Sequence, residues 1–487
     1  MGEISRAALD FSVEVDAPPH LAFDATRADA LVTVRARAVE GGVPHGPVPS
    51  AEVLIMDRSS SMAGLGKLDE AKRAICAAVD TLREGTLLGI VAGHRTATVV
   101  YPPGGGLVRV DAAHKREAKA RVAAQLAHGG TAIGTWLECA RRLFDASTAP
   151  GTVRHAVLYT DGKDQDESPE ELDAALAACT DRFTCDARGL GEDWNHHELR
   201  RVADALHGSA EAVIDITDLT RDFVALMERA QRVVVPHLYL GLRLNERLGL
   251  GFVHQTRPVQ VDLTRQSQQY GDEIHIPLGS WSAEARQYQI SLRFEAGALP
   301  VDEELRAARI VLHTEPPDGG GRVPCAPPDA FLVRRWPNPA FEVPVPDFQT
   351  RVRTEQELGM AMRACADAHA QQDGTRADRE LRLALGLAEE LGDERRLRLL
   401  RAVADTDAGG RAVVRRDVTR GEMQRLGLDS TRTGPLPLDA IERIAAGPAG
   451  AARRRCPHCG EALASPGAQY CEHCGRHVDD EGIGTGG

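Results

Sequence analysis

The sequence lacks the features that would assign it to a membrane, to secretion or to nucleic acid. No stretch approaches the ~18 uninterrupted apolar residues that a transmembrane helix requires. The opening MGEISRAALD has no apolar segment of the kind that a signal peptide carries. Lys and Arg number 58 against 71 Asp and Glu, and the resulting net charge of -13 argues against nonspecific binding to nucleic acid or anionic membranes. We therefore expect a cytoplasmic protein that does not bind membranes.

A nucleotide-binding signature and a convincing disulfide framework are also missing. The chain has no G-x-x-x-x-G-K-[ST] motif. Four of its ten cysteines form one tight C-terminal group, and several others lie among Ala and Leu in segments with helical periodicity. A free cysteine in such a place behaves as a small hydrophobic residue, so disulfides are the weaker interpretation.

The pattern of residues 49–233 predicts an α/β domain. At 487 residues the chain is too long for one ordinary core, and ~150 residues per domain suggests about three units. Within 49–233, short apolar runs such as AEVLIM and HAVLYT alternate with amphipathic ones such as KLDEAKRAICAAVDTLRE. This alternation is typical of a doubly wound, mostly parallel sheet covered by helices on both faces.

Residues 234–346 follow a different pattern, in which apolar and polar residues alternate with period two. HLYLGLRLN and YQISLRF are examples, and they predict antiparallel strands. FSVEVDA and ALVTVRARAV, within residues 1–48, share this pattern. Two strands cannot bury a face alone, so we expect 1–48 to join the later strands in one β-sandwich, with the α/β domain inserted between them in sequence.

The C-terminal part divides by composition. Residues 350–405 carry helix formers with Leu and Ala at three-to-four spacing, which predicts a small helical region. Gly-rich breaks indicate a linker over 406–452. Residues 453–478 form a cysteine-rich module, and the final EGIGTGG lies in an expected mobile tail, 479–487.

An excess of oxygen-bearing side chains follows the first strand of the α/β domain. VLIMDRSSSM places Asp57, Ser59 and Ser61 in the spacing D-x-S-x-S where the strand ends. GGTAIGT opens a helix at Thr131, and VLYTDG ends another strand at Asp161. Sheets of this kind bind ligands beyond the carboxyl ends of their strands. Two carboxylates and three hydroxyls are hard donors that suit Mg²⁺ better than zinc or copper.

These five residues, in this order, resemble the metal-ion-dependent adhesion site of the von Willebrand factor type A (VWA) family. The family motif is D-x-S-x-S, then a distant Thr, then a distant Asp, and the resemblance covers about residues 51–230. It implies that Ser59, Ser61 and Thr131 coordinate a divalent cation, Mg²⁺ or alternatively Mn²⁺ or Ca²⁺. It also implies that the two aspartates bind the ion directly or through water, and that a partner's carboxylate completes the shell.

Two other interpretations of these residues are weaker. Asp57, Ser59 and Thr131 could merely cap helices, but three such pieces at matched strand ends favour a metal site. A haloacid-dehalogenase type of phosphoryl transfer needs D-x-D, and Ser59 stands where the second aspartate would act as general acid. We therefore expect no enzymatic activity. Three histidines of this domain, to which the sequence gives no placed partner, receive no role: His94, His196 and His197.

The cysteine-rich module RRRCPHCGEALASPGAQYCEHCGRHV predicts a zinc site. Each C-x-x-C-G forms a tight turn, and four thiolates give zinc a closed tetrahedral shell. The predicted ligands are Cys456, Cys459, Cys471 and Cys474. The module resembles zinc ribbons, and we expect a structural or protein-docking role because no aromatic ladder accompanies Arg453–Arg455.

The combination of a VWA domain and a zinc ribbon resembles bacterial VWA proteins of tellurium-resistance-type stress systems, whose relatives act beside protein kinases and phosphatases. We expect a nonenzymatic interaction or scaffold protein whose partner offers an acidic residue to the metal. An alternative is an accessory subunit, similar to the VWA component that works with a AAA+ ATPase in metal insertion or complex remodelling. Nucleic-acid binding through the ribbon is a third possibility, and it predicts salt-sensitive affinity.

Overall fold

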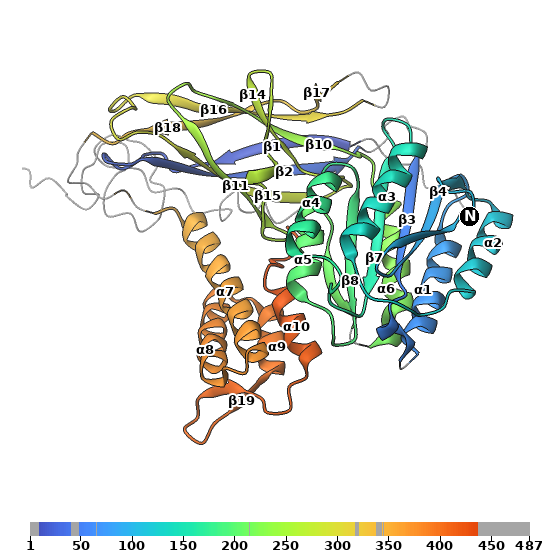
Figure 1. The fold of residues 1–487 in the computed structure, drawn as a ribbon. Helices are drawn as coiled ribbons and strands as arrows, with labels where there is room; N and C mark the ends of the chain where they lie inside the picture. The colour runs from blue at the N-terminus through green and yellow to red at the C-terminus, as the bar shows by residue number, and fades with distance from the viewer. Residues whose placement is uncertain are drawn as a thin grey trace, which may run out of the picture. The chain divides into compact units, whose positions relative to one another are not determined.

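The computed structural model describes most of the chain up to residue 436 (Figure 1). The described residues are 9–39, 48–64, 66–213, 215–316, 321–337, 343 and 345–436. The predicted zinc ribbon, with Cys456, Cys459, Cys471 and Cys474, lies outside them, as does the predicted tail 479–487. No helix of the described part is both long and apolar enough to cross a membrane.

A mostly parallel sheet forms the centre of the α/β domain. Its strands run in the order β5-β4-β3-β7-β8-β9, and β6 also pairs with β4. The pairs from β4 through β9 are parallel, whereas β5 and β6 are antiparallel to β4. The strand bounds are β3 (Ser50–Asp57), β4 (Leu87–Gly93), β5 (Ala97–Tyr101), β6 (Val108–Arg109), β7 (Val153–Thr160), β8 (Thr184–Leu190) and β9 (Ala210–Val213).

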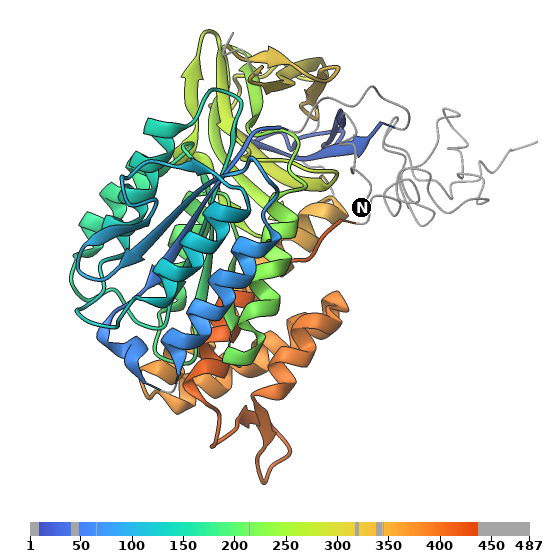
Figure 2. The same ribbon diagram turned by 90° about the vertical axis from the view of Figure 1, so that its right-hand side faces the viewer.

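Helices cover both faces of this sheet, because its strands are apolar on both sides. Figures 1 and 2 show the helices packed on either side of the strands. On β3, Leu54 and Met56 belong to one hydrophobic cluster with residues of α1, α2 and α6, while Val53 and Ile55 belong to another with residues of α3, α4 and α5. This confirms the predicted α/β fold with a mostly parallel sheet. The helices are η1 (Ser60–Ala63), α1 (Lys67–Thr81), α2 (Ala112–Ala123), α3 (Ile133–Ser147), α4 (Pro169–Cys179), α5 (His196–Ala205), η2 (Ile216–Asp218) and α6 (Leu219–Ala230).

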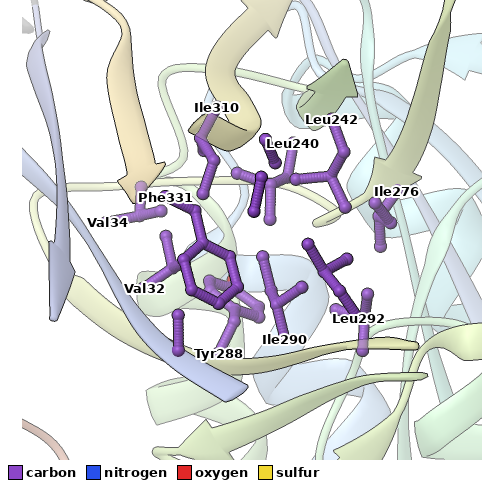
Figure 3. Packing of buried hydrophobic residues seen from close by; sticks show 14 of the residues in the cluster. Val32, Val34, Leu240, Leu242, Ile276, Tyr288, Ile290, Leu292, Ile310 and Phe331 are labelled. Atoms are coloured by element: carbon purple, nitrogen blue, oxygen red, sulfur yellow. The ribbon is translucent and has the colours of Figure 1, made fainter. Parts of the chain in front are cut away.

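Two antiparallel sheets share a separate hydrophobic core, to which Val32, Leu240, Ile290 and Phe331 contribute (Figure 3). The first has the order β1-β2-β15-β11-β12, and the second has β13-β14-β10-β16-β17 with β18 paired to β16. Their bounds are β1 (Leu9–Asp16), β2 (Arg27–Ala38), β10 (Leu238–Leu244), β11 (Gly249–Arg257), β12 (Val261–Asp262), η3 (Thr264–Gln266), β13 (Gln268–Tyr270), β14 (Glu273–Pro277), β15 (Ala285–Arg293), β16 (Glu304–Thr314), β17 (Val323–Pro324) and β18 (Asp329–Arg334).

The N-terminal strands therefore pair with a strand that follows the α/β domain in sequence. β2 lies antiparallel to β15 along the whole length of β15, from Arg27 opposite Arg293 to Arg35 opposite Ala285. β1 then pairs with the other edge of β2. The α/β domain is inserted between these two contributions to one sheet.

The C-terminal helices form a fourth hydrophobic cluster. Residues 404–436 include the whole described part of the expected linker, 406–436, and they form a hairpin and a helix. Thr419 and Glu422 start that helix with a reciprocal capping box, and Met423 and Leu426 bury its apolar side in the cluster. The elements are α7 (Asp347–Ala370), α8 (Gly374–Leu391), α9 (Glu394–Ala402), β19 (Ala404–Thr406), β20 (Ala412–Val414) and α10 (Arg420–Asp429).

Candidate metal site of the α/β domain

Asp57 ends β3 as a fully buried carboxylate. Its Oδ1 accepts a hydrogen bond from the backbone N–H of Ser59 at 2.7 Å, and its Oδ2 accepts one from the hydroxyl of Thr160 at 2.6 Å. Burial outweighs these bonds and raises the pKa of Asp57 to about 6. Both neighbours are neutral donors, so they fix the carboxylate in place without compensating its charge.

The two predicted serines link Asp57 to Asp161. Ser59 Oγ lies 2.9 Å from Ser61 Oγ, and Ser61 Oγ donates to Asp161 Oδ1 at 2.6 Å. Ser59 and Asp161 are buried, whereas Ser61 is exposed. This chain of oxygens therefore runs from the end of the sheet out to solvent.

Thr131 joins the same group from the loop before α3. A Cβ atom built on Gly162 would lie 3.5 Å from both Ser61 Oγ and Thr131 Oγ1, so the two hydroxyls flank one small space that the glycine leaves open. Ser59, Ser61 and Thr131 line a pocket of about 370 Å³. The structure thus brings together all five side chains that the sequence selected.

Three carboxylates from the loop after β7 hold the start of α3, whose own N-cap residue, Ala132, has no side chain to accept a hydrogen bond. Asp166 Oδ2 accepts from the N–H of Thr131 at 2.8 Å. Asp164 Oδ2 accepts from the N–H of Ile133 at 3.2 Å, and Glu167 accepts from that of Gly134 at 2.5 Å. Acceptors at a helix N-terminus are stabilising, and here they position Thr131.

The environment of Asp164 shows how crowded this acidic loop is. Burial, together with a hydrogen bond to Glu167 and that group's charge, raises the pKa of Asp164 to about 9. The charge of Glu167 thus disfavours ionisation of its neighbour Asp164. The three carboxylates at the start of α3 all come from the acidic run DGKDQDE, but its role in capping this helix was not predicted.

Lys67 is a second contributor that the motif does not include. Its Nζ lies 2.6 Å from Asp161 Oδ2, and the two side chains are 12% and 0% exposed. Asp161 thus has one oxygen on Ser61 and the other on an ammonium group, so its charge is compensated within the chain. Lys67 opens α1, a position that in the sequence looks like an ordinary helix start.

The rim of the pocket is basic on one side. Lys163 and Arg420 both line it, and Arg420 comes from α10, far along the chain. Arg420 lies 3.6 Å from Asp193, another lining residue. These cations would favour an anionic group that approaches the hydroxyls.

The donor set fits a hard divalent cation. The two serine hydroxyls and that of Thr131 would hold the ion, and Asp57 and Asp161 would bind it directly or through water. Asp57 offers the clearest observation in support, because a buried carboxylate with only neutral neighbours gains most from a nearby cation. A bound Mg²⁺ supplies an exchangeable position at which a carboxylate can replace a water.

Comparisons with known proteins agree on the family. A model of the von Willebrand factor type A domain matches residues 51–212. The structure of a von Willebrand factor type A protein from Catenulispora acidiphila is 32% identical, with a TM-score of 0.80 over 90% of this chain and 99% of that one. The ArnB paralog VWA2 from Sulfolobus acidocaldarius, 15% identical with a TM-score of 0.52 over 88% of this chain and 99% of that one, shares the fold. A search of curated proteins found no match. The chain belongs to the von Willebrand factor type A family.

Proposed function

We propose that this protein is a nonenzymatic, divalent-metal-dependent interaction or scaffold protein. VWA domains are generally involved in metal-dependent protein interactions, and this chain carries such a domain. The observation that carries the proposal is the convergence of Ser59, Ser61 and Thr131 with two aspartates in a pocket that opens to solvent at Ser61. A protein partner binds by placing a carboxylate on the metal.

The charge around the pocket supports an acidic partner. Once the ion is bound, an incoming Asp or Glu side chain meets that cation and Lys163, with Arg420, which is paired with Asp193, at the same rim. Charges arranged in this way steer association and select the partner. The basic rim also explains why a neutral hydroxyl donor would be a poorer ligand than a carboxylate.

The finer assignment rests on the resemblance stated from the sequence. We propose a bacterial, cytoplasmic setting in a stress-response or kinase and phosphatase signalling system, with Mg²⁺ as the ion at the VWA site. Zn²⁺ at Cys456, Cys459, Cys471 and Cys474 completes the proposal. The identity of the captured partner decides between this pathway and an accessory role beside a AAA+ ATPase.

Partner capture with and without metal tests the proposal. The purified full-length protein would be used to capture partners from a lysate in Mg²⁺ or in EDTA, and captured proteins would be identified by mass spectrometry. Ser61→Ala and Thr131→Ala should lose the Mg²⁺-dependent partners, and calorimetry should show weaker Mg²⁺ binding. Ser60→Ala is the matched control, because this serine lies between the two of the motif. Capture that is equal in Mg²⁺ and EDTA would overturn the proposal.

A further inference from the structure

A second group of metal-ligand side chains lies where α5 of the α/β domain meets α7 of the C-terminal helices. His197 Nε2 lies 2.8 Å from Asp367 Oδ1, and His196 Nε2 lies 3.5 Å from the same oxygen. One potential ligand atom from each of the three residues lies within 4.8 Å of the others. Two imidazoles and one carboxylate therefore converge on one point.

The hydrogen bonds of His196 fix which of its nitrogens carries the proton. Gln424 Oε1, on α10, accepts from the backbone N–H of His196 at 3.0 Å, so this atom is the amide oxygen. The same oxygen lies 2.7 Å from His196 Nδ1. An amide oxygen only accepts, so Nδ1 carries the hydrogen and Nε2 of the neutral ring presents its lone pair.

That lone pair is buried and faces a carboxylate. His196 is 4% exposed, and its Nε2 makes no hydrogen bond. A buried lone pair directed at the Asp367 oxygen is unfavourable by itself, and a cation between the two atoms removes the conflict.

The arrangement around His196 is that of a metal-binding histidine. Such a histidine usually donates its second N–H to a fixed acceptor that orients the ring, and Gln424 is that acceptor here. For tetrahedral zinc with Zn–N bonds of ~2.0–2.1 Å, neighbouring ligand atoms lie about 3.3 Å apart. The observed separations of 2.8 and 3.5 Å lie on either side of this value.

His275, in another cluster of the described residues, shows what a satisfied histidine looks like. Its Nδ1 lies 3.1 Å from a guanidinium nitrogen of Arg322, which can only donate, so the ring proton is on Nε2. That Nε2–H reaches Glu273 Oε2 at 3.0 Å. Both nitrogens of His275 are used, whereas His196 leaves Nε2 without a hydrogen bond, as His313 of the second cluster leaves its Nδ1.

We propose that His196, His197 and Asp367 form a Zn²⁺ site that ties the α/β domain to the C-terminal helices. Imidazole and carboxylate donors favour zinc over Mg²⁺, so this site differs in chemistry from the oxygen-lined pocket. His197 is 47% exposed and Asp367 31%, which leaves room for a water as fourth ligand. Because Gln424 and Arg420 lie on the same helix, α10, the zinc also fixes Arg420 at the rim of the pocket.

Zinc stoichiometry of the full-length protein tests this proposal. Metal-free protein would be loaded with Zn²⁺ and passed through gel filtration, and zinc per chain measured by elemental analysis. Asp367→Asn should retain one ion per chain fewer than the parent, and His197→Gln, at an exposed side chain, should do the same. His114→Gln is the control, because His114 pairs with one carboxylate, Asp111, in the same way but belongs to no cluster. All variants keep the C-terminal cysteines, so any zinc bound there contributes equally to parent and variants and does not affect the difference between them.

Cobalt adds a readout that separates the two kinds of site. Co²⁺ bound by thiolates gives intense charge-transfer absorption, while a histidine and carboxylate site gives weak visible bands. Asp367→Asn should lose visible absorption and keep any charge-transfer band. Zn²⁺ should also raise the thermal midpoint of the parent more than that of either variant. Equal zinc content and equal Zn²⁺-induced shifts in parent, Asp367→Asn and His197→Gln would overturn the site.

Discussion

Two buried carboxylates on the same strand, β3, are compensated in opposite ways. Glu52 is 1% exposed and lies 2.7 Å from His155 on β7, whose other ring nitrogen lies 3.1 Å from Asp186 on β8. Asp57 is equally buried, but its partners are a backbone N–H and the hydroxyl of Thr160. Glu52 thus finds its positive partner within the chain, and Asp57 does not.

This difference distinguishes a carboxylate that stabilises the fold, Glu52, from one proposed to bind a ligand, Asp57, on the same strand. The charged row across β3, β7 and β8 pairs both of its carboxylates with His155 in the free protein and serves the fold. At the carboxyl end of β3, the hydrogen bonds to Asp57 come from neutral groups, as is expected of a carboxylate that binds a cation. Burial alone therefore does not mark a binding site; burial without an internal counter-charge does.

The largest expected effect comes from neutralising Asp57. Asp57→Asn keeps the shape of the side chain and removes the charge that a metal would balance. Mg²⁺ affinity should fall by more than the roughly 10–100-fold that the loss of an outer-shell partner costs, and metal-dependent capture should vanish. Calorimetry measures the first and the capture assay the second, with circular dichroism to verify the fold. Unchanged Mg²⁺ affinity would mean that Asp57 has no role in metal binding.

Glu52→Gln should show the reverse pattern. His155 keeps its second carboxylate, Asp186, so the free energy of unfolding should fall by about 1.5–3 kcal/mol, as for a lost hydrogen bond between charged groups. Urea denaturation of parent and variant measures this loss. Mg²⁺ binding by the folded variant should remain as in the parent, and a variant that unfolds at the same urea concentration would contradict the comparison.

Lys67→Met tests the comparison at Asp161. This carboxylate has an ion-pair partner within the chain, as Glu52 does, and lies at the proposed metal site, as Asp57 does. Without metal, the variant leaves Asp161 with only the Ser61 hydroxyl, and the free energy of unfolding should fall by about 2 kcal/mol, as for a lost hydrogen bond to a charged group. Mg²⁺ should restore most of that stability and bind more tightly than to the parent. Urea denaturation of the variant with and without Mg²⁺ measures this. A loss of unfolding free energy that Mg²⁺ does not restore would contradict the prediction.

His155 should also give the stability of the protein a pH dependence. Burial opposes its charge, but the carboxylates of Glu52 and Asp186 prevail and raise the pKa of His155 to about 10. Its unfolded pKa is about 6.5, so this stabilisation is fully present below pH 6.5 and is lost as pH rises toward 10. The loss is at most about 1.4 kcal/mol per pH unit. Urea midpoints at pH 7 and 9 should fall more for the parent than for His155→Gln.

The sequence was sufficient for the α/β fold and for selecting five oxygen-bearing residues that the structure brings close together, whereas their binding of a metal stays a prediction. The alternation of apolar and amphipathic runs predicts parallel strands separated by helices. A motif at the end of such a strand can be recognised from local spacing, because the carboxyl ends of parallel strands lie at the same edge of the sheet. Asp57, Ser59 and Ser61 lie within five residues, and Thr131 and Asp161 follow strand-end or helix-start signals of their own. Patterns of this kind depend on residues close in sequence, so they can be recognised without knowledge of the fold.

Features that depend on distant partners could not be predicted. Lys67 looks like a helix start until the structure places it on Asp161. His196 and His197 gain meaning only with Asp367, 170 residues beyond His197, and with Gln424 on a helix that composition had suggested was a linker. The capping box of that helix was a local signal, T-x-x-E, that could have revealed it.

The insertion of the α/β domain between β2 and β15 sets an order for synthesis on the ribosome. β1 and β2 emerge first, but Thr33 cannot meet its partner Gln287 until some 250 further residues have been made. The α/β domain is complete at α6, well before then, and folds as a unit. During that interval the free edge of β2 is open to pairing with other nascent chains. A translational pause before β15 would therefore lengthen the interval in which the protein is most prone to aggregate.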